Sequence, residues 1–369
     1  MQEREKRRIV IASILKPTDD TRMSEKIGAT LYRSGLYDVT VIGYSSSGKP
    51  MEGLNIVPVG AFPRLSYSRW WARWQVLHLS LAIRPEVFIF STYELLFPAI
   101  FLKVILGTRI IYDVRENYYR NILHSEGLPR WLRWPLAVVV RFLEKITAPA
   151  IDYFFLAEKG YEKEFRFHRG GWIVLENKAT PVQVRGAKRE GNPLRLLFSG
   201  TLSESTGVFR AIKLAEALHR ENKEVTLTIA GYASTSDLRD RIRKEASGHS
   251  FIQLIGIDAL VPHSEILDLV QASHAGIIAY ERFPHTENCV PTKLFEYLQA
   301  SLPILAEPHW SWVARFEYGH PFLLVDFENP DAKAILNTLA HSPFYTSPIT
   351  DVEWSSEEPK LLATIKTLV

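Results

Sequence analysis

The stretch that decides the fold reads Pro291-Thr292-Lys293-Leu294-Phe295-Glu296-Tyr297 and leads into an apolar run at residues 302–305. Its proline and threonine favour the start of a helix. The unpaired N–H groups of the first helical turn, with Lys293 beside them, predict an anion site. Glu296 lies one turn further along the same side. A cation for phosphate next to a carboxylate for sugar hydroxyls indicates a nucleotide ligand. The alternative is a surface Lys–Glu pair on an ordinary helix.

Length and composition limit the class of protein. A chain of 369 residues exceeds one ordinary core and predicts two domains. A hydrophobic content of 46% with 23% charged residues is typical of a soluble globular protein. The single cysteine, Cys289, excludes an intramolecular disulfide framework and fits a reducing cytosol. No Cys and His cluster has metal-ligand spacing, so we interpret His263 and His285 as isolated polar residues.

The amino-terminal segment lacks the pattern of a targeting signal. Residues 1–8 are charged, and the apolar run at 9–12 is too short for a signal-peptide core. The longest apolar candidate, residues 95–107, is interrupted by Pro98 and Lys103 and is too short to span a bilayer. We therefore expect a cytoplasmic protein without a membrane-spanning helix.

Charge and tryptophan are concentrated in the first half of the chain. Residues 1–180 contain 26 Lys and Arg and 18 Asp and Glu, whereas residues 181–369 contain 18 and 23. Two segments of the basic half, 68–74 and 130–134, alternate arginine with tryptophan. Such segments suit contact with anionic lipid, which predicts peripheral binding to a membrane. The alternative is that the tryptophans belong to the core and the arginines form a solvated rim.

Strands and helices alternate through the first half. Buried parallel strands are predicted at residues 8–13, 39–43, 55–59, 87–91, 109–113 and 153–157. Helices are predicted between them at 20–34, 69–83, 95–106 and 132–148. This spacing indicates βαβ units and a parallel sheet.

The second half repeats this alternation after a polar, irregular stretch at residues 178–193 that we interpret as a hinge. Strands are predicted at 194–199, 225–230, 252–254, 275–279, 303–306 and 322–325. Helices are predicted at 208–222, 236–247, 263–272, 292–300, 331–341 and 355–368. The fold class is therefore α/β, with two tandem Rossmann-like, doubly wound domains.

Glycines follow several predicted strands of the second half. The loop at 199–208 contains Gly200 and Gly207, which permit close backbone approach and positive φ before a helix begins. Gly231 clears space at the next strand end, and the Gly256-Ile257 pair suits backbone contact with a flat base. Because ligands of doubly wound sheets bind at the carboxyl ends of strands, these loops and the Lys293 helix predict one nucleotide site.

At these positions the chain resembles glycosyltransferases of the GT-B fold, in which two Rossmann-like domains face a cleft, and especially bacterial family-4-type enzymes (glycosyl transferases group 1). The match covers nearly the whole length and rests on residues 199–207, 230–231 and 291–304. Residues 15–22 and 112–119 look like acceptor-side loops of bacterial surface-polysaccharide transferases.

The resemblance implies a domain organisation and an activity. It implies an acceptor-side domain over 1–180, a hinge over 181–193 and a nucleotide-sugar-binding domain over 194–345. Residues 346–369 would form a helix that packs back toward the first domain. The implied reaction moves a sugar from a UDP- or GDP-linked donor to a cell-envelope glycan or glycolipid, in the cytoplasm or at the inner face of the cell membrane. No metal, cofactor or nucleic acid is expected.

The resemblance also implies roles for single residues. Glu296 would accept hydrogen bonds from the ribose, and Lys293 with the first-turn N–H groups would hold the diphosphate, where positive charge stabilises the leaving group. Gly200 would close over the diphosphate, and backbone at Ile257 would contact the base. The implied donor-binding residues are Gly200, Thr201, Gly231, Ile257, Asn288, Thr292, Lys293 and Glu296.

Two departures from the family pattern concern the donor side. Many relatives have Arg after the first loop glycine and Lys before the second, where this chain has Thr201 and Thr206. Lys293 and nearby Arg282 would then cover the diphosphate charge. Many retaining members also have an E-x7-E pair, but the position eight before Glu296 is Asn288. Its neighbours Glu281 and Glu287 are out of register, so the stereochemical outcome stays open.

An inverting reaction needs a general base for the acceptor hydroxyl. Asp113 and Glu116 follow the strand at 109–112, and Asp20 follows the first strand, so all three are candidates at the cleft. The alternative for Asp113 is a helix or turn cap.

Three other functions compete with transfer. The missing loop cations are compatible with a non-catalytic scaffold or partner subunit at the membrane. A nicotinamide dehydrogenase is disfavoured because no G-x-G-x-x-G follows the strand at 8–13. A sugar-nucleotide epimerase would share the architecture and differ in its products.

Overall fold

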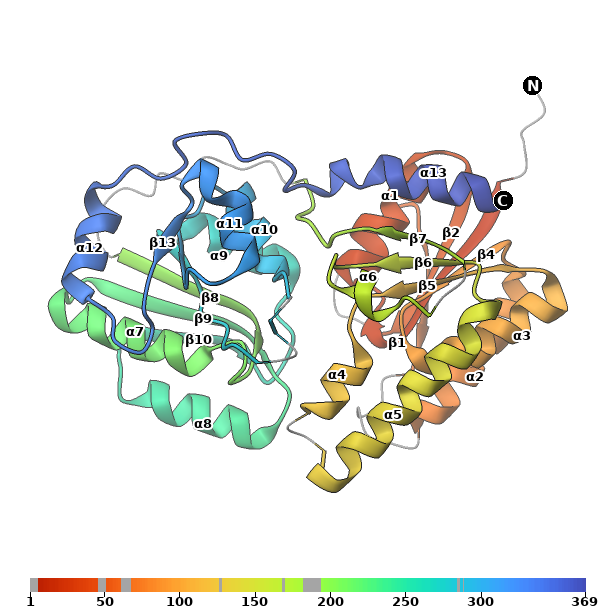
Figure 1. The fold of residues 1–369 in the computed structure, drawn as a ribbon, viewed down its shortest axis with the longest axis horizontal. Coiled ribbons are helices and arrows are strands. Elements are labelled where there is room, and N and C mark those ends of the chain that lie inside the picture. Colours follow the sequence, from red (N-terminus) through yellow and green to blue (C-terminus); the bar gives the residue numbers. More distant parts are fainter. Residues whose placement is uncertain are drawn as a thin grey trace. The chain divides into compact units, whose positions relative to one another are not determined.

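The computed structural model describes residues 6–45, 51–60, 68–125, 128–167, 170–181, 194–283, 286–287 and 289–369. Contacts divide the chain into two compact units (Figure 1). Unit 1 comprises Met1–Thr180 and Trp354–Val369, and unit 2 comprises Pro181–Glu353. Of the segment predicted as a hinge, residues 182–193 lie outside the described ranges.

Unit 1 contains a parallel sheet of seven strands, counted over its described residues, in the order β3-β2-β1-β4-β5-β6-β7. The runs of Val, Ile and Phe in the central strands are buried on both faces, as parallel sheets require. The strands are β1 Arg7–Pro17, β2 Tyr37–Tyr44, β3 Asn55–Val59, β4 Val87–Phe90, β5 Arg109–Val114, β6 Tyr153–Leu156 and β7 Gly171–Val174. The strand order reverses between β1 and β4, and ligands of doubly wound sheets commonly bind at such a reversal.

Helices cover both faces of this sheet. One face carries α2 Ser68–Ile83, α3 Leu96–Leu106 and α5 Arg130–Thr147. The other face carries the π-helical turn η1 Thr21–Gly28, α1 Ala29–Arg33 and α13 Glu358–Leu368 (Figure 1). Two short helices, α4 Tyr118–Leu123 and α6 Tyr161–Glu164, follow β5 and β6.

The last helix of the chain belongs to unit 1. The Trp354 backbone N–H donates to the carbonyl of Ala179, and its indole Nε1 donates to Thr30 Oγ1 over 2.9 Å. Lys178 Nζ lies 2.5 Å from Glu357 Oε1, and both side chains are buried. Residues 346–353, which the sequence assigns to the same closing segment, fall in unit 2.

Unit 2 contains six parallel strands within its described residues, in the order β10-β9-β8-β11-β12-β13. They are β8 Leu194–Leu202, β9 Val225–Ala233, β10 Ile252–Ile257, β11 Ala275–Ile278, β12 Ile304–Ala306 and β13 Phe322–Leu324. The helices are α7 Val208–Glu221, α8 Ser236–Ser247, α9 His263–Ala272, α10 Thr292–Gln299, α11 Ser311–Phe316 and α12 Ala332–His341. The order reverses between β8 and β11. Two parallel, Rossmann-like sheets confirm the predicted α/β fold class.

Candidate functional site

Lys293 is buried in the first turn of α10, where only 6% of the residue is exposed. Within the part of the chain that the structure describes, its Nζ has no hydrogen-bond partner. The ammonium instead lies 4.3 Å from the ring centroid of Phe198 and 5.5 Å from that of Tyr280. Burial lowers the pKa of Lys293 to about 7, although the carboxylate of Glu296 opposes this. A buried ammonium in this state is suited to an anionic ligand.

The glycine loop after β8 lies against this ammonium. Gly200 has φ +101°, and a Cβ placed on it would stand 3.5 Å from Lys293 Cε and 3.8 Å from Nζ. Gly200 pairs in register with Gly231 of β9, which pairs with Gly256 of β10. A Cβ on Gly231 would stand 1.8 Å from the Gly200 carbonyl oxygen. Three glycines from separate motifs therefore form one row across the sheet beside Lys293.

No side chain caps the first turn of α10, whose N-cap residue is Pro291. The turn therefore keeps the positive end of the helix dipole without a capping side chain of its own. Thr292, predicted to contact the donor, is the first residue of this helix.

Two tyrosine contacts hold α10 in place. Tyr297 is fully buried, and its hydroxyl lies 2.9 Å from Ser199 Oγ at the end of β8. A Cβ on Gly276 of β11 would stand 2.4 Å from the Tyr297 ring. Because Tyr297 is on the same helix as Lys293 and Glu296, these contacts hold the helix that carries both side chains.

Glu296 lies one turn beyond Lys293 and is also buried, with 8% exposed. Its Oε1 is 3.1 Å from Nε2 of His263, the first residue of α9. We interpreted His263 as an isolated polar residue, but the structure places it against the carboxylate predicted to bind the ribose. The one sequence signal for this role is the position of His263 at the start of the helix that follows the Gly256-Ile257 strand end.

The end of β10 has a constrained backbone. Gly256 and Ile257 both have positive φ, at +86° and +54°. The side chain of Ile257 is buried, so any contact with a base would use its backbone. Positive φ at a β-branched residue costs about 1–3 kcal/mol and is found mainly at functional positions. The base contact predicted for Ile257 stays a prediction.

Thr201 and Thr206, in the loop after β8, are joined by a hydrogen bond. Thr206 Oγ1 donates to the carbonyl of Thr201 over 2.9 Å and accepts from the Ser203 backbone N–H over 3.0 Å. Gly207, which follows, has φ +83° and is the N-cap residue of α7. These hydrogen bonds close the loop, but they add no positive charge to it.

Two further predicted participants are Arg282 and Asn288. The Arg282 guanidinium is 3.5 Å from Glu287 Oε1, and 66% of its side chain is exposed. Asn288 lies outside the described residues. Glu281 donates its backbone N–H to Ser205, which ties it to the loop before α7. Burial raises the pKa of Glu281, against the effect of Arg210.

Arg210 is a structural residue of this site that sequence reasoning missed. It is buried on α7, and its guanidinium donates to the carbonyls of Ala279 and Tyr280 over 3.2 and 3.3 Å. It also pairs with Glu307, 2.7 Å away. Arg210 thereby anchors the loop that leads from β11 towards α10. No local pattern marks this role, because its partners come from two other strand ends.

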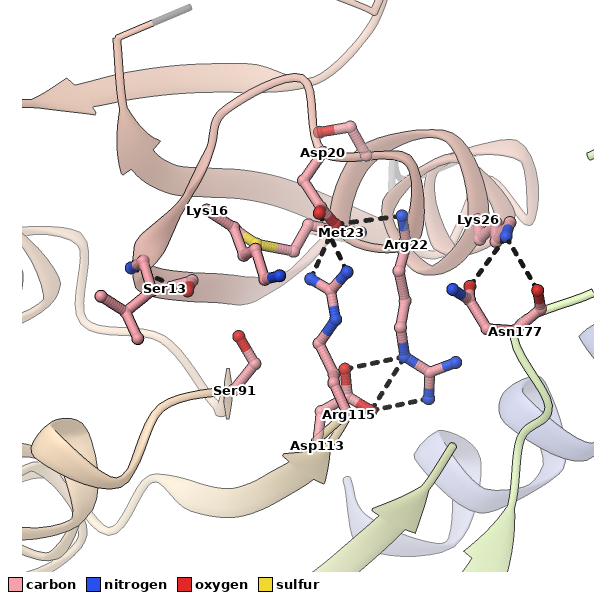
Figure 2. A network of polar contacts seen from close by, with 12 residues as sticks. Ser13, Lys16, Asp20, Arg22, Met23, Lys26, Ser91, Asp113, Arg115 and Asn177 are labelled. Atoms are coloured by element: carbon pink, nitrogen blue, oxygen red, sulfur yellow. Dashed lines mark hydrogen bonds and ion pairs between the residues drawn. The ribbon is translucent and has the colours of Figure 1, made fainter. Parts of the chain in front are cut away.

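In unit 1, Asp113 is held in a buried ion pair (Figure 2). Arg22 Nε and Nη2 lie 2.9 and 2.7 Å from its carboxylate oxygens, and Arg22 Nη1 donates to the carbonyl of Leu175. Both charged side chains are almost fully buried. Removing one partner would leave the other charge buried and unpaired. This geometry supports a structural role for Asp113, and its role as a base stays a prediction.

Asp20 is similarly engaged (Figure 2). It caps η1 by accepting from the backbone N–H groups of Arg22 and Met23. Both its oxygens also accept from Arg115, over 2.7 and 2.9 Å. Burial alone would raise the pKa of Asp20, but Arg115 and Lys16 bring it down to about 2. A carboxylate with so low a pKa is a weak base at neutral pH.

Glu116 is the most accessible of the three carboxylates. Lys16 Nζ lies 2.9 Å from its Oε1, and Asn121 Nδ2 donates to its Oε2 over 3.1 Å. About a third of its side chain is exposed. At the nearby end of β4, the hydroxyls of Ser91 and Thr92 are buried without a hydrogen-bond partner among the residues described. These hydroxyls lie at the strand-order reversal of unit 1 and were not predicted.

Among the residues that the structure describes, no group of three or more His, Cys, Asp or Glu side chains could hold a metal ion. None of the helices formed by these residues has both the length and the apolar character needed to cross a bilayer.

Comparison with known proteins shows the fold. No family model matches the chain. No curated protein matches it either. Solved structures do match over almost the whole length. Sucrose-phosphate synthase from Thermosynechococcus elongatus superposes with a TM-score of 0.69 at 10% identity, covering 98% of this chain and 99% of that one.

Two other structures are similar. An α,α-trehalose-phosphate synthase (UDP-forming) from Burkholderia vietnamiensis has a TM-score of 0.67 at 11% identity, with 98% and 100% of the chains covered. Anabaena HepE in complex with UDP and glucose has a TM-score of 0.65 at 12% identity, with 97% and 99% covered. The chain thus has the fold of these three structures.

Proposed function

We propose that this protein is a glycosyltransferase that moves a sugar from a nucleoside diphosphate sugar to a cell-envelope glycan or glycolipid. The observation that carries the proposal is the buried Lys293 ammonium, which lies beside Gly200 and one helical turn from Glu296. A diphosphate would supply the anion that Lys293 lacks, and a ribose would supply hydroxyls for Glu296.

Charge explains how this arrangement would assist transfer. The nucleoside diphosphate leaves with growing negative charge as the glycosidic bond breaks. Lys293 and the first turn of α10 present fixed positive charge that needs no rearrangement during the reaction. An anion next to Lys293 also raises its pKa, so the bound donor keeps it protonated. For the same reason we propose that this step needs no divalent metal.

Two of the similar structures favour uridine as the base. One is a UDP-forming synthase, and another is a complex with UDP and glucose. We therefore propose a UDP-linked sugar as the first donor to test, with GDP-linked sugars as the comparison. For an inverting reaction, Glu116 is our preferred general base among the three carboxylates, because Asp113 and Asp20 are committed to arginines.

Donor binding tests the site directly. We expect UDP-glucose or another UDP-sugar to bind the full chain with a Kd in the micromolar to millimolar range and to raise its Tm. Glu296→Ala should weaken binding, whereas Glu287→Ala, at an exposed position nearby, should not. The weakening should disappear when the donor contains 2′-deoxyribose, because the hydroxyl that Glu296 binds is then missing. Unchanged binding by Glu296→Ala would end the site assignment.

One observation favours a second function. Threonines at 201 and 206 occupy the positions where many enzymes of the resembled family direct two cations at the diphosphate, and Thr206 Oγ1 donates to the Thr201 carbonyl. A non-catalytic scaffold or partner subunit at the membrane surface could keep the fold and lose turnover. Release of UDP from any UDP-sugar above the uncatalysed rate, with or without added EDTA, would exclude this alternative. Loss of release in EDTA alone would contradict metal independence.

A further inference from the structure

Helix α5 has its apolar side outward. Its exposed side chains recur at helical spacing, are 38–77% exposed, and are Trp131, Trp134, Val138, Val139, Phe142 and Ile146. Its buried side contains the small or medium apolar residues Ala137 and Val140 together with Thr147 and with Glu144, which accepts a hydrogen bond from Tyr112. A helix that covers a core in water has the opposite arrangement. The outward face of α5 is therefore built to contact something other than water.

Helices α3 and α2 extend this apolar surface. Helix α3 packs against both α5 and α2, and the three lie in one layer over the sheet of unit 1 (Figure 1). Helix α3 exposes Phe97, Phe101, Val104 and Ile105, and α2 exposes Trp70, Trp71 and Trp74. The tryptophans of both Arg-Trp segments are thus on the surface, and the core alternative is wrong for them. We call these thirteen side chains the α2–α3–α5 surface.

Cations outnumber carboxylates on the three helices of this surface. Helices α2, α3 and α5 contain seven Lys and Arg residues and a single carboxylate, the buried Glu144. Arg73 stacks on the ring of Trp70, with 3.8 Å between the guanidinium carbon and the ring centroid. Burial lowers the pKa of Arg73, against the effect of Glu94. The cations lie among or beside the exposed aromatic rings, as interfacial anchors do.

A hollow at the end of α3 places further arginines beside this surface. It has a volume of about 530 Å³ and is lined by residues that include Arg7, Arg8, Arg84 and Arg109, with Glu86 as the acidic side chain among them. Ile105 lines the hollow and also belongs to the α2–α3–α5 surface. An apolar surface that ends in an arginine-lined hollow fits acyl chains beside anionic headgroups.

We propose that the α2–α3–α5 surface binds an anionic lipid bilayer and lies in its interface. The tryptophans would sit at headgroup level, where amphipathic rings are favoured, and the Val, Ile and Phe side chains would reach the acyl region. The cations would pair with anionic headgroups. Of the seven cations on these helices, Arg69, Lys103 and Arg141 pair with Glu94, Asp152 and Glu164 of neighbouring segments. Arg130 and Lys145 are exposed on α5, and they favour an anionic bilayer over an uncharged protein partner.

This inference deepens the proposed function, since a lipid-linked acceptor would be presented at the same membrane. It can be tested apart from that function, because vesicle binding needs neither donor nor acceptor. The full chain is co-sedimented with vesicles of equimolar phosphatidylcholine and phosphatidylglycerol, and with phosphatidylcholine alone. We expect binding to the anionic vesicles that is at least tenfold stronger and that weakens as salt shortens the Debye length.

Matched variants locate the contact. Trp131→Ser with Trp134→Ser should reduce partitioning roughly tenfold or more, while Trp172→Ser, at an exposed tryptophan on β7, should leave it unchanged. Arg130→Glu with Lys145→Glu should reduce binding by about fivefold or more for each charge, and Lys213→Glu with Lys244→Glu on unit 2 should not. Circular dichroism and UDP-sugar binding check that each variant is folded.

Three results would overturn the proposal. The first is equal vesicle binding by the Trp131/Trp134 variant and the Trp172 variant. The second is binding that ignores both lipid charge and salt. The third is a dimer in sedimentation velocity that the Trp131/Trp134 substitutions dissociate, with no vesicle binding by the original chain, because a second copy would then cover this surface.

Discussion

The amine of Lys293 lies beside the backbone of Gly200, with only 3.8 Å between Nζ and the position of a Cβ on that glycine. Lys293 comes from α10 and Gly200 from the end of β8, so the contact joins two motifs that are distant in sequence. A phosphate group could be bound by both only if this space stays free. The size of residue 200 is therefore a direct test of the site.

Gly200→Ala should weaken UDP-sugar binding by tenfold or more. The added Cβ enters the space beside Nζ, and φ +101° is costly for any residue with a side chain, at about 1–2 kcal/mol. Gly248→Ala is the control, because Gly248 has φ −79° and nothing within 4 Å of its Cβ position. Calorimetric titration and Tm separate lost affinity from lost stability. Equal affinity in the two variants would place the diphosphate elsewhere.

Lys293→Met should stabilise the ligand-free protein at low pH. The folded-state pKa of Lys293, about 7, lies below its ordinary value of 10.5, so burying its charge opposes folding. This cost is fully present below pH 7 and fades as the pH rises towards 10.5, because the folded state then holds the neutral amine. We expect a gain in the free energy of unfolding of roughly 1–4 kcal/mol at pH 6 and a smaller gain at pH 9. Urea unfolding at both pH values measures it.

The affinity for a UDP-sugar should depend on pH through the same residue. The donor binds the protonated amine, so affinity should be highest below pH 7 and fall as the pH rises above it. A UDP-sugar is the appropriate ligand because its diphosphate, esterified at both ends, does not titrate in this range. Lys293→Arg, which stays protonated, should bind with little pH dependence. A pH dependence that persists in Lys293→Arg would assign it to another group.

Most regular elements could be predicted because their signals are local. The strands at 8–13 and 194–199 are apolar runs, and the helix at 208–222 has a clear apolar side, so each was expected within a few residues of its observed bounds. The short elements were missed. Strand β7 is a four-residue strand at the end of the sheet, and α4 depends on a cap by Asn117 and on packing against α5. Such elements depend on tertiary contacts that no local pattern contains.

Some residues of the candidate site could likewise be predicted from sequence, and others could not. Lys293 and Glu296 could be paired from sequence because both lie on one turn of one helix. His263 and Arg210 could not, since their partners come from other elements: Glu296 for the first, and the strand ends at Ala279 and Glu307 for the second. The outward tryptophans were left open because helical spacing shows that one side of a helix is apolar and does not show which way it points.

His263→Ala should weaken UDP-sugar binding by roughly three- to tenfold, the effect of one hydrogen bond to a charged group. The ring holds Glu296 Oε1, and without it the carboxylate can turn away from the ribose. His263→Gln, which can still donate, should restore most of the affinity. If both variants bind the UDP-sugar as well as the original protein, Glu296 is positioned by other contacts and His263 has no role in donor binding.

Substitutions of Asp113 and Glu116 should have different effects on the stability of the protein. Asp113→Asn leaves Arg22 buried beside a neutral amide, so we expect a loss of about 3–5 kcal/mol in the free energy of unfolding. Glu116→Gln should keep the fold, because Glu116 is partly exposed and its ion pair with Lys16 contributes at most about 1 kcal/mol.

If Glu116 is the general base, Glu116→Gln should lower the transfer rate by 10²- to 10⁴-fold with unchanged donor affinity, and the acidic limb of the pH–rate profile should vanish. Thermal unfolding and product assays of Asp113→Asn and Glu116→Gln measure the effects on stability and on transfer. Full activity in Glu116→Gln would remove the residue from the reaction and favour a mechanism in which the acceptor needs no protein base.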